Sequence, residues 1–174
     1  NQEHKFSFFS SPITNTTPSK TFNLSDAHEY IISHKASNAT ELFRSMKDKE
    51  YAKEFKIKNF DYVTFSGTFT NRNDKNLTSY SNLICFDFDK LENIEEAKKL
   101  LCNDPYFDTL LLFMSPSGNG LKWVIHNPLC QSGHQDFFNA VANYLSTTYS
   151  LKVDMSGKDI SRACFLPHDP NCVY

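Results

Sequence analysis

The chain has 174 residues, of which 40% are hydrophobic and 14% aromatic, a composition typical of a folded protein with one sizeable core. Its formal net charge of -2 and pI of about 6.3 exclude a global basic field, so any binding of nucleic acid has to be local. No apolar stretch approaches the roughly 20 residues of a membrane span. Five scattered cysteines without a CxxC pair predict free thiols and a cytoplasmic location.

The N-terminal part of the chain predicts a strand and several helical segments. Residues 1–25 are rich in Ser, Thr, Asn and Pro around a small Phe cluster, which favours a short edge strand followed by a loop. Ser25 and Asp26 offer an N-cap for the first helix. The helical segments are expected over residues 27–33, 39–46 and 48–55. We therefore expect residues 1–60 to form a subregion packed on a core of residues 61–174, within one compact domain.

Lysines gather in and around the last of these helical segments. They occupy Lys47, Lys49, Lys53, Lys56 and Lys58. Because acidic residues alternate with them, our first interpretation is a solvated helix face. A local patch that contacts phosphate is the alternative.

The next segments predict a β-hairpin that ends in two carboxylates. Tyr62–Phe69 is dense in β-branched and aromatic residues, and a polar turn with Arg72 near its tip leads to the strand Leu83–Asp89. Alternate side chains of a strand share a face, so Asp87 and Asp89 are expected to point the same way, with the residue between them in the core. Two such carboxylates repel one another unless a cation lies between them. The pair is therefore either a solvated strand end or part of a metal site.

A helix and a glycine-containing loop follow. Apolar residues between Leu91 and Leu101 have the spacing of an amphipathic helix, and the apolar run Tyr106–Met114 predicts a buried central strand. In the next loop, backbone N–H groups can approach an anion closely because small residues stand at Ser115, Ser117, Gly118 and Gly120. A tight hairpin turn without a ligand is the alternative for this loop.

The last third of the chain adds a strand, a long helix and a third carboxylate. Leu121–His126 predicts a strand on which Lys122 and His126 share one face. His134–Thr148 has the apolar spacing of an amphipathic helix. Leu151–Asp154 is expected as a short strand that ends in the third carboxylate.

Charged residues crowd the C-terminal tail around one short apolar strand. They are Lys158, Asp159, Arg162, His168 and Asp169. Because a buried charge without a partner is costly, they need partners. Arg162 could hold a phosphate or a carboxylate, or form a structural ion pair with Asp159 or Asp87. Hydrogen bonding within a Pro-flanked turn is expected for His168 and Asp169.

The order of these parts resembles the catalytic core of the archaeo-eukaryotic primase superfamily, the primase-polymerases. The resemblance is closer to the N-terminal domain of Bacteroides proteins called VirE N-terminal or BT4734-like, which often precedes a helicase-like region. It rests on Ser66–Phe69, Leu83–Asp89, Leu112–Trp123 and Asp154–Pro170. It implies an α+β fold of the primase-polymerase (RRM-like) type, with a mostly antiparallel sheet and flanking helices.

The same resemblance implies a metal-dependent nucleotidyltransferase. The superfamily's acidic motifs fall on Asp87, Asp89 and Asp154, which would act as catalytic ligands of Mg²⁺ or Mn²⁺. Where the superfamily normally carries a phosphate-binding His, this chain has Lys122, and His126 could take that role instead. The expected nucleotide-binding set is Ser115, Ser117, Gly118, Gly120, Lys122, His126, Lys158, Arg162 and Arg72.

The expected partners follow from that activity. They are nucleoside triphosphates, single-stranded DNA or RNA and a C-terminal helicase-like domain, in DNA replication or mobile elements, without a membrane. One alternative is a degenerate domain of this fold that binds nucleotide or nucleic acid without turnover. Another is a phosphatase like the haloacid dehalogenases, to whose plan Ser115 and Lys122 could be fitted, although its parallel sheet needs helical crossovers that Gly118–Trp123 leaves no room for.

Overall fold

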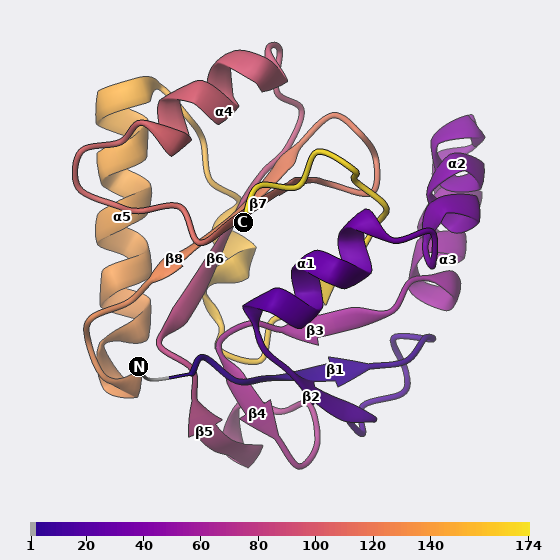
Figure 1. Ribbon diagram of the computed structural model, residues 1–174, viewed down its shortest axis with the longest axis horizontal. Helices are drawn as coiled ribbons and strands as arrows, with labels where there is room; N and C mark the ends of the chain where they lie inside the picture. The colour runs from indigo at the N-terminus through magenta and orange to yellow at the C-terminus, as the bar shows by residue number, and fades with distance from the viewer. Residues whose placement is uncertain (1–2) are drawn as a thin grey trace.

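The computed structural model describes residues 3–174 as an α+β arrangement of antiparallel sheets flanked by helices (Figure 1). This confirms the expected α+β class with antiparallel strands and flanking helices. The strands are β1 (Phe6–Phe9), β2 (Lys20–Phe22), β3 (Tyr62–Thr64), β4 (Gly67–Phe69), β5 (Leu77–Tyr80), β6 (Leu83–Phe88), β7 (Leu111–Met114), β8 (Leu121–His126) and β9 (Cys164–Phe165). The α-helices are α1 (Leu24–Ile32), α2 (Ser37–Ser45), α3 (Lys49–Asn59), α4 (Ile94–Cys102) and α5 (His134–Tyr149).

A three-stranded sheet in the order β6-β8-β7 separates two apolar cores. Side chains alternate along its strands, so Phe86 and Trp123 join the core beneath α4 and α5, while Leu83 and Val124 join the core shared with α1 and β1. Figure 1 shows α4 and α5 together on one side of these strands. The alternation turns Asp87 away from α4 and α5, toward the second sheet.

That second sheet has four strands in the order β2-β1-β3-β9 and joins distant parts of the chain. In it, β1 pairs with β2 and β3, and β3 pairs with β9, which places Tyr62 opposite Phe165. The expected edge strand near the N-terminus is therefore wrong in one respect, because β1 is an inner strand and β2 forms the edge. Residues before position 60 thus share a sheet with the C-terminal tail.

The predicted hairpin between Tyr62–Phe69 and Leu83–Asp89 is wrong. The first segment breaks after Thr64, whose hydroxyl donates to the Gly67 carbonyl (3.1 Å), and its second half pairs with β5 in a separate two-stranded sheet. Gly67 permits this pairing, because a Cβ atom there would lie 2.3 Å from the Ser79 carbonyl oxygen. Strand β6 pairs with β8 instead.

Two further strand predictions need correction. The run from Tyr106 forms a strand only from Leu111 onward, because the Asp104 carboxylate accepts hydrogen bonds from the backbone of Tyr106 and Phe107 (both 2.9 Å) and turns the chain there. The resulting β7 lies at the edge of its sheet, with β8 at the centre. The segment before Asp154 is extended but forms no strand.

Helix boundaries differ from the prediction where a cap was misjudged. Helix α1 begins at Leu24, because Asn23 rather than Ser25 is the N-cap and exchanges hydrogen bonds with Asp26 in a capping box. Asp48 caps α3 and Asn93 caps α4, so both helices begin after the residues expected. None of the helices within residues 3–174 has the length and apolar character needed to cross a membrane. All five cysteines have free thiols, as predicted.

Candidate functional site

A pocket of about 370 Å³ lies between the end of β6, helix α3 and the C-terminal tail. Four acidic side chains line it, those of Asp87, Asp89, Asp154 and Asp159. Four basic side chains line it as well, those of Lys56, Arg72, Lys122 and Arg162. The structure therefore brings together residues that are far apart in the sequence and that carry both signs of charge.

Asp87, Asp89 and Asp154 form the acidic side of the pocket. Asp87 is the penultimate residue of β6 and Asp89 directly follows the strand, while Phe88 between them is buried, as the alternation predicts. The Asp154 N–H donates to the Asp87 carbonyl (2.8 Å), which places the tail along the free edge of β6. The three acidic positions expected from the sequence thus line one pocket.

The Asp154 carboxylate is held locally. It accepts hydrogen bonds from the Ser156 backbone N–H (3.0 Å) and hydroxyl (2.8 Å) at the start of a short 3₁₀ helix. Burial on its own would raise the pKa of Asp154, but these hydrogen bonds, together with Arg162 and Lys122, outweigh burial and lower it. Asp154 is therefore a carboxylate at neutral pH, with one oxygen engaged by Ser156.

Lys122 pairs with Asp87. The two residues lie opposite one another in the β6–β8 register, and Lys122 Nζ lies 3.0 Å from Asp87 Oδ1, with the side chains only 12% and 15% exposed. Burial on its own would lower the pKa of Lys122, but the Asp87 carboxylate outweighs it and raises the pKa above the ordinary lysine value. Lys122 is thus charged, and its ammonium neutralises one acid of the pocket.

Arg72 and Arg162 form part of the basic side. Arg72 lies in the loop that joins β4 to β5, a different hairpin from the one expected. Its Nε donates to the Tyr62 hydroxyl (3.1 Å), and its guanidinium lies 5.4 Å from the centre of the Tyr62 ring. Arg162 forms no ion pair with Asp159 or Asp87, so the structural salt bridge considered for it is not present. Its side chain is available to a ligand.

Lys56 is a charged residue of the pocket that was not expected among the site residues. It was one of five lysines in and around one helical segment, and the pattern of charges did not distinguish it from the others. In the structure Lys56 is half-buried and lines the pocket, whereas Lys53 and Lys58 on the same helix are exposed. A stricter helical projection of α3, with Ala52, Phe55 and Lys56 on its inner side, would have singled it out.

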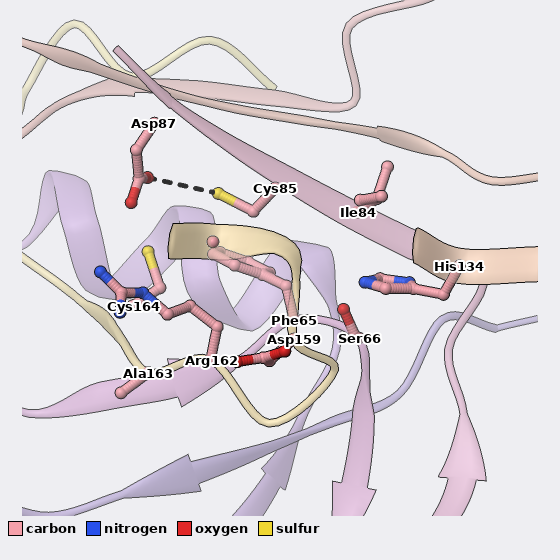
Figure 2. Close-up of a pocket in the computed structure, with 11 residues that line it drawn as sticks. Phe65, Ser66, Ile84, Cys85, Asp87, His134, Asp159, Arg162, Ala163 and Cys164 are labelled. Atoms are coloured by element: carbon pink, nitrogen blue, oxygen red, sulfur yellow. Dashed lines mark hydrogen bonds between the residues drawn. The ribbon is translucent and has the colours of Figure 1, made fainter. Parts of the chain in front are cut away.

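Two free thiols, the partly buried Cys85 and the buried Cys164, line a small cavity next to Asp87 (Figure 2). A cavity of about 20 Å³ is lined by Cys85, Cys164, Asp87 and Arg162, and the Cys85 thiol donates to Asp87 Oδ1 at 3.9 Å. Figure 2 shows that the Asp87 carboxylate and the Arg162 guanidinium lie on the same side of β6. A hydrogen bond with Cys164, and then burial, raise the pKa of Cys85, so its thiol is neutral.

The glycine-containing loop lies outside the pocket. Arg44 of α2 donates to the carbonyl oxygens of Pro116 (3.0 Å) and Ser115 (3.1 Å), and the Gly118 N–H donates to Ser115 O (3.0 Å). Gly118 has a left-handed φ of 81°, as a tight turn requires. Ser117 and Gly120 also belong to this turn and not to the pocket lining. The geometry matches the hairpin-turn alternative.

His126 and Lys158 do not line the pocket either. His126 lies opposite Leu83 at the far end of β8, four residues or about 13 Å from Lys122, with its ring beside that of His4. Of the two candidates for the phosphate-binding motif, only Lys122 is therefore in the pocket. In the tail, His168 Nδ1 donates to Ser33 O (2.6 Å) and Asp169 accepts from Met114 N (2.8 Å), so both side chains bond to distant residues and not only within their turn. Asp169 also accepts from Asn171 N (3.0 Å), which is the turn hydrogen bond expected for it.

The acidic residues suit a hard divalent cation by donor type. Carboxylate oxygens are the ligands that Mg²⁺ and Mn²⁺ prefer, and Asp87, Asp89 and Asp154 bring them to one pocket. Across residues 3–174, no group of three or more His, Cys, Asp or Glu side chains is already arranged around a metal position. The Lys122 ammonium is bonded to Asp87 Oδ1, one of the carboxylate oxygens that a metal ion would need.

The fold and this pocket define a class: an α+β domain with acidic and basic side chains facing one another at the end of an antiparallel strand. The chain belongs to the BT4734-like, N-terminal domain family, which matches residues 55–174. This confirms the family expected from the sequence motifs, and the matched region contains every charged residue of the pocket. No curated protein and no solved structure matched the chain.

Proposed function

We propose that the pocket binds a nucleoside triphosphate together with Mg²⁺ or Mn²⁺, and that the domain is a nucleotidyltransferase of the primase-polymerase type. One observation carries this proposal: four carboxylates and four cationic side chains line the same pocket at the end of β6. Carboxylates alone would suit a cation, and cationic side chains alone would suit an anion. Their combination suits an anion that arrives with a metal, as a nucleotide does.

The acidic and the basic side chains would bind different parts of this ligand. Asp87, Asp89 and Asp154 would hold the cation, and Arg162 and Arg72 would orient the phosphates through planar groups that donate two hydrogen bonds. The bound cation would align an attacking hydroxyl with the α-phosphate and stabilise the charge that develops during transfer. Asp154, whose pKa is lowered, is ready to act as a ligand without first losing a proton.

The second substrate of such a reaction would be single-stranded DNA or RNA carrying the attacking hydroxyl. The net charge of -2 means that attraction of this strand is local. Helix α3, which lines the pocket through Lys56, also carries exposed lysines at Lys49 and Lys53. A helicase-like domain C-terminal to this one would deliver the single strand.

The antiparallel pairing of β6, β8 and β7 bears on the alternatives. A phosphatase of the haloacid-dehalogenase plan requires a parallel sheet, so the pairing gives that alternative no support. A binding module without turnover remains the second candidate, because Lys122 already neutralises Asp87 and the domain lacks the usual motif histidine.

A primer-extension assay with Mn²⁺, nucleoside triphosphates and a single-stranded template tests the proposal. We expect labelled product from the wild type and none from Asp89→Asn, which removes a metal ligand at an exposed position where folding is not at risk. Glu41→Gln, an exposed acid on α2, is the matched control and should behave as wild type. Nucleotide binding without product would favour the binding module, and absence of both would refute the proposal.

A further inference from the structure

We infer that Lys56 of helix α3, together with Arg162, contacts the phosphates of the nucleotide, and that Lys122 does not. This inference rests on the proposed function and adds a residue to it. It assigns the phosphate contact to an element outside the β6–β8 sheet that carries the acidic motif.

The position of Lys56 supports the inference. Its side chain is half-buried and lines the pocket with Asp89 and Arg162. Its Nζ lies over the Phe165 ring, 5.7 Å from the ring centre, and this cation–π contact holds the ammonium beside another residue of the pocket lining. Within residues 3–174, this ammonium has neither an ion-pair partner within 4.0 Å nor a hydrogen-bond acceptor.

The charges around Lys56 also favour an anion. Burial, followed by repulsion from Lys122, lowers the pKa of Lys56; Arg162 adds to the repulsion, and Asp89 and Asp87 only partly offset it. A half-buried ammonium beside two further cations is stabilised when a phosphate is placed among them. A phosphate bound among these cations would offset the repulsion between them.

Lys122 is unsuited to the same task. Its ammonium lies 3.0 Å from Asp87 Oδ1, and reaching a phosphate would require this ion pair to break. Lys56 has no such bond to break. The phosphate contact is therefore less costly to form through Lys56.

Helix α3 is fixed in place, so Lys56 is preorganised. The Asp48 side chain caps the helix by accepting from Tyr51 N (3.0 Å). The Ile13 N–H donates to Ile57 O (2.8 Å), which ties the helix to another residue of the pocket lining. Less freedom is lost on binding when the contacting element is already held in position.

Nucleotide binding by a charge-removing variant tests the inference. Lys56→Met keeps a side chain of similar length beside Phe165 but removes the charge. Lys56→Arg keeps the charge. The matched control is Lys58→Met, at an exposed position two residues away. The probe is a fluorescent nucleoside triphosphate titrated with Mn²⁺ present. We expect Lys56→Met to weaken binding about tenfold or more, since a hydrogen bond to a charged group is lost. Lys56→Arg should retain most of the affinity, and Lys58→Met all of it.

Binding of Mn²⁺ alone, followed by electron paramagnetic resonance, separates a phosphate contact from a structural role. Lys56→Met should bind Mn²⁺ at least as well as wild type, because a nearby positive charge is removed. If Lys56→Met binds nucleotide as well as Lys58→Met does, the assignment of Lys56 is wrong and the proposed function stands. If the wild type binds no nucleotide, both fail. Parallel loss of Mn²⁺ and nucleotide binding in Lys56→Met would show a structural defect and overturn the inference.

Discussion

Replacing Lys122 with methionine tests whether an internal cation and a bound metal compete for the same carboxylate. Methionine keeps most of the apolar stem and removes the ammonium that lies 3.0 Å from Asp87 Oδ1. Asp87 would then keep its charge without its partner, in a position where its side chain is only 15% exposed. Two effects should follow: a loss of stability without metal, and a gain in metal binding.

The loss of stability can be bounded from the exposure of the pair. Breaking a fully buried pair costs about 3–5 kcal/mol, whereas an exposed pair contributes below about 1 kcal/mol. The side chains of Lys122 and Asp87 are 12% and 15% exposed and border an open pocket, so we expect about 2 kcal/mol. For a domain of this size, that lowers the Tm by about 4–8 °C.

Thermal unfolding with and without Mn²⁺ measures both effects. The Tm of Lys122→Met should be lower than that of wild type without metal, and Mn²⁺ should raise it by more than it raises the wild-type value, because the freed oxygen can bind the cation. Lys5→Met is the matched control, since Lys5 forms an exposed ion pair with Glu3 at 3.7 Å. If Lys122→Met has the same Tm as the control, and Mn²⁺ raises that Tm no more than it raises the wild-type value, then Lys122 and the metal do not compete for Asp87.

Two further predictions concern stability. Burial lowers the pKa of His134 to about 4, and the opposing effects of Asp74 and Asp159 are weaker. Below about pH 6.5 the imidazole is therefore protonated in the unfolded chain but stays neutral in the folded protein until the pH approaches 4. Stability should therefore fall by about 3 kcal/mol between pH 6.5 and pH 4, and urea unfolding of His134→Gln should lack that part of the decline. Asp104→Ala removes the acceptor of hydrogen bonds from two backbone N–H groups and two tyrosine hydroxyls, so it should cost about 2–4 kcal/mol in urea unfolding, and an unchanged midpoint would contradict this.

The acidic side of the site could be predicted because it depends on a local rule. Side chains alternate along a strand whatever its partners are, so the run before Asp87 and Asp89 predicted both their common direction and the burial of Phe88. The same rule placed Lys122 and His126 on one face. It could not say which of them lies near Asp87, because that depends on the register of β6 against β8.

The errors arose where a distant residue decides the local structure. Arg44, 72 residues before Pro116, donates to the backbone of the turn that had been expected to bind an anion. Strand β5 pairs with β4, although the sequence suggested that β4 continues Tyr62–Thr64 as one strand. The break between β3 and β4 is marked by the close approach of Gly67 to Ser79. Such contacts have no signature in the sequence around the residue concerned. For Lys56 the helical projection could show that it lies on the inner side of α3, but not that β6, β9 and the tail form a pocket there.

The register of β6 against β8 also determines the role of Lys122. A cationic residue directly opposite Asp87 pairs with it, here at 3.0 Å, and contacts a phosphate only if that pair breaks. Phosphate recognition then has to come from another element that reaches the pocket with an unpaired charge. Lys56 on α3 and Arg162 on the tail meet that requirement from opposite ends of the family's matched region, residues 55–174. If this is so, substitution of Lys56 should affect nucleotide binding more than substitution of Lys122, and substitution of Lys122 should affect metal binding more than substitution of Lys56.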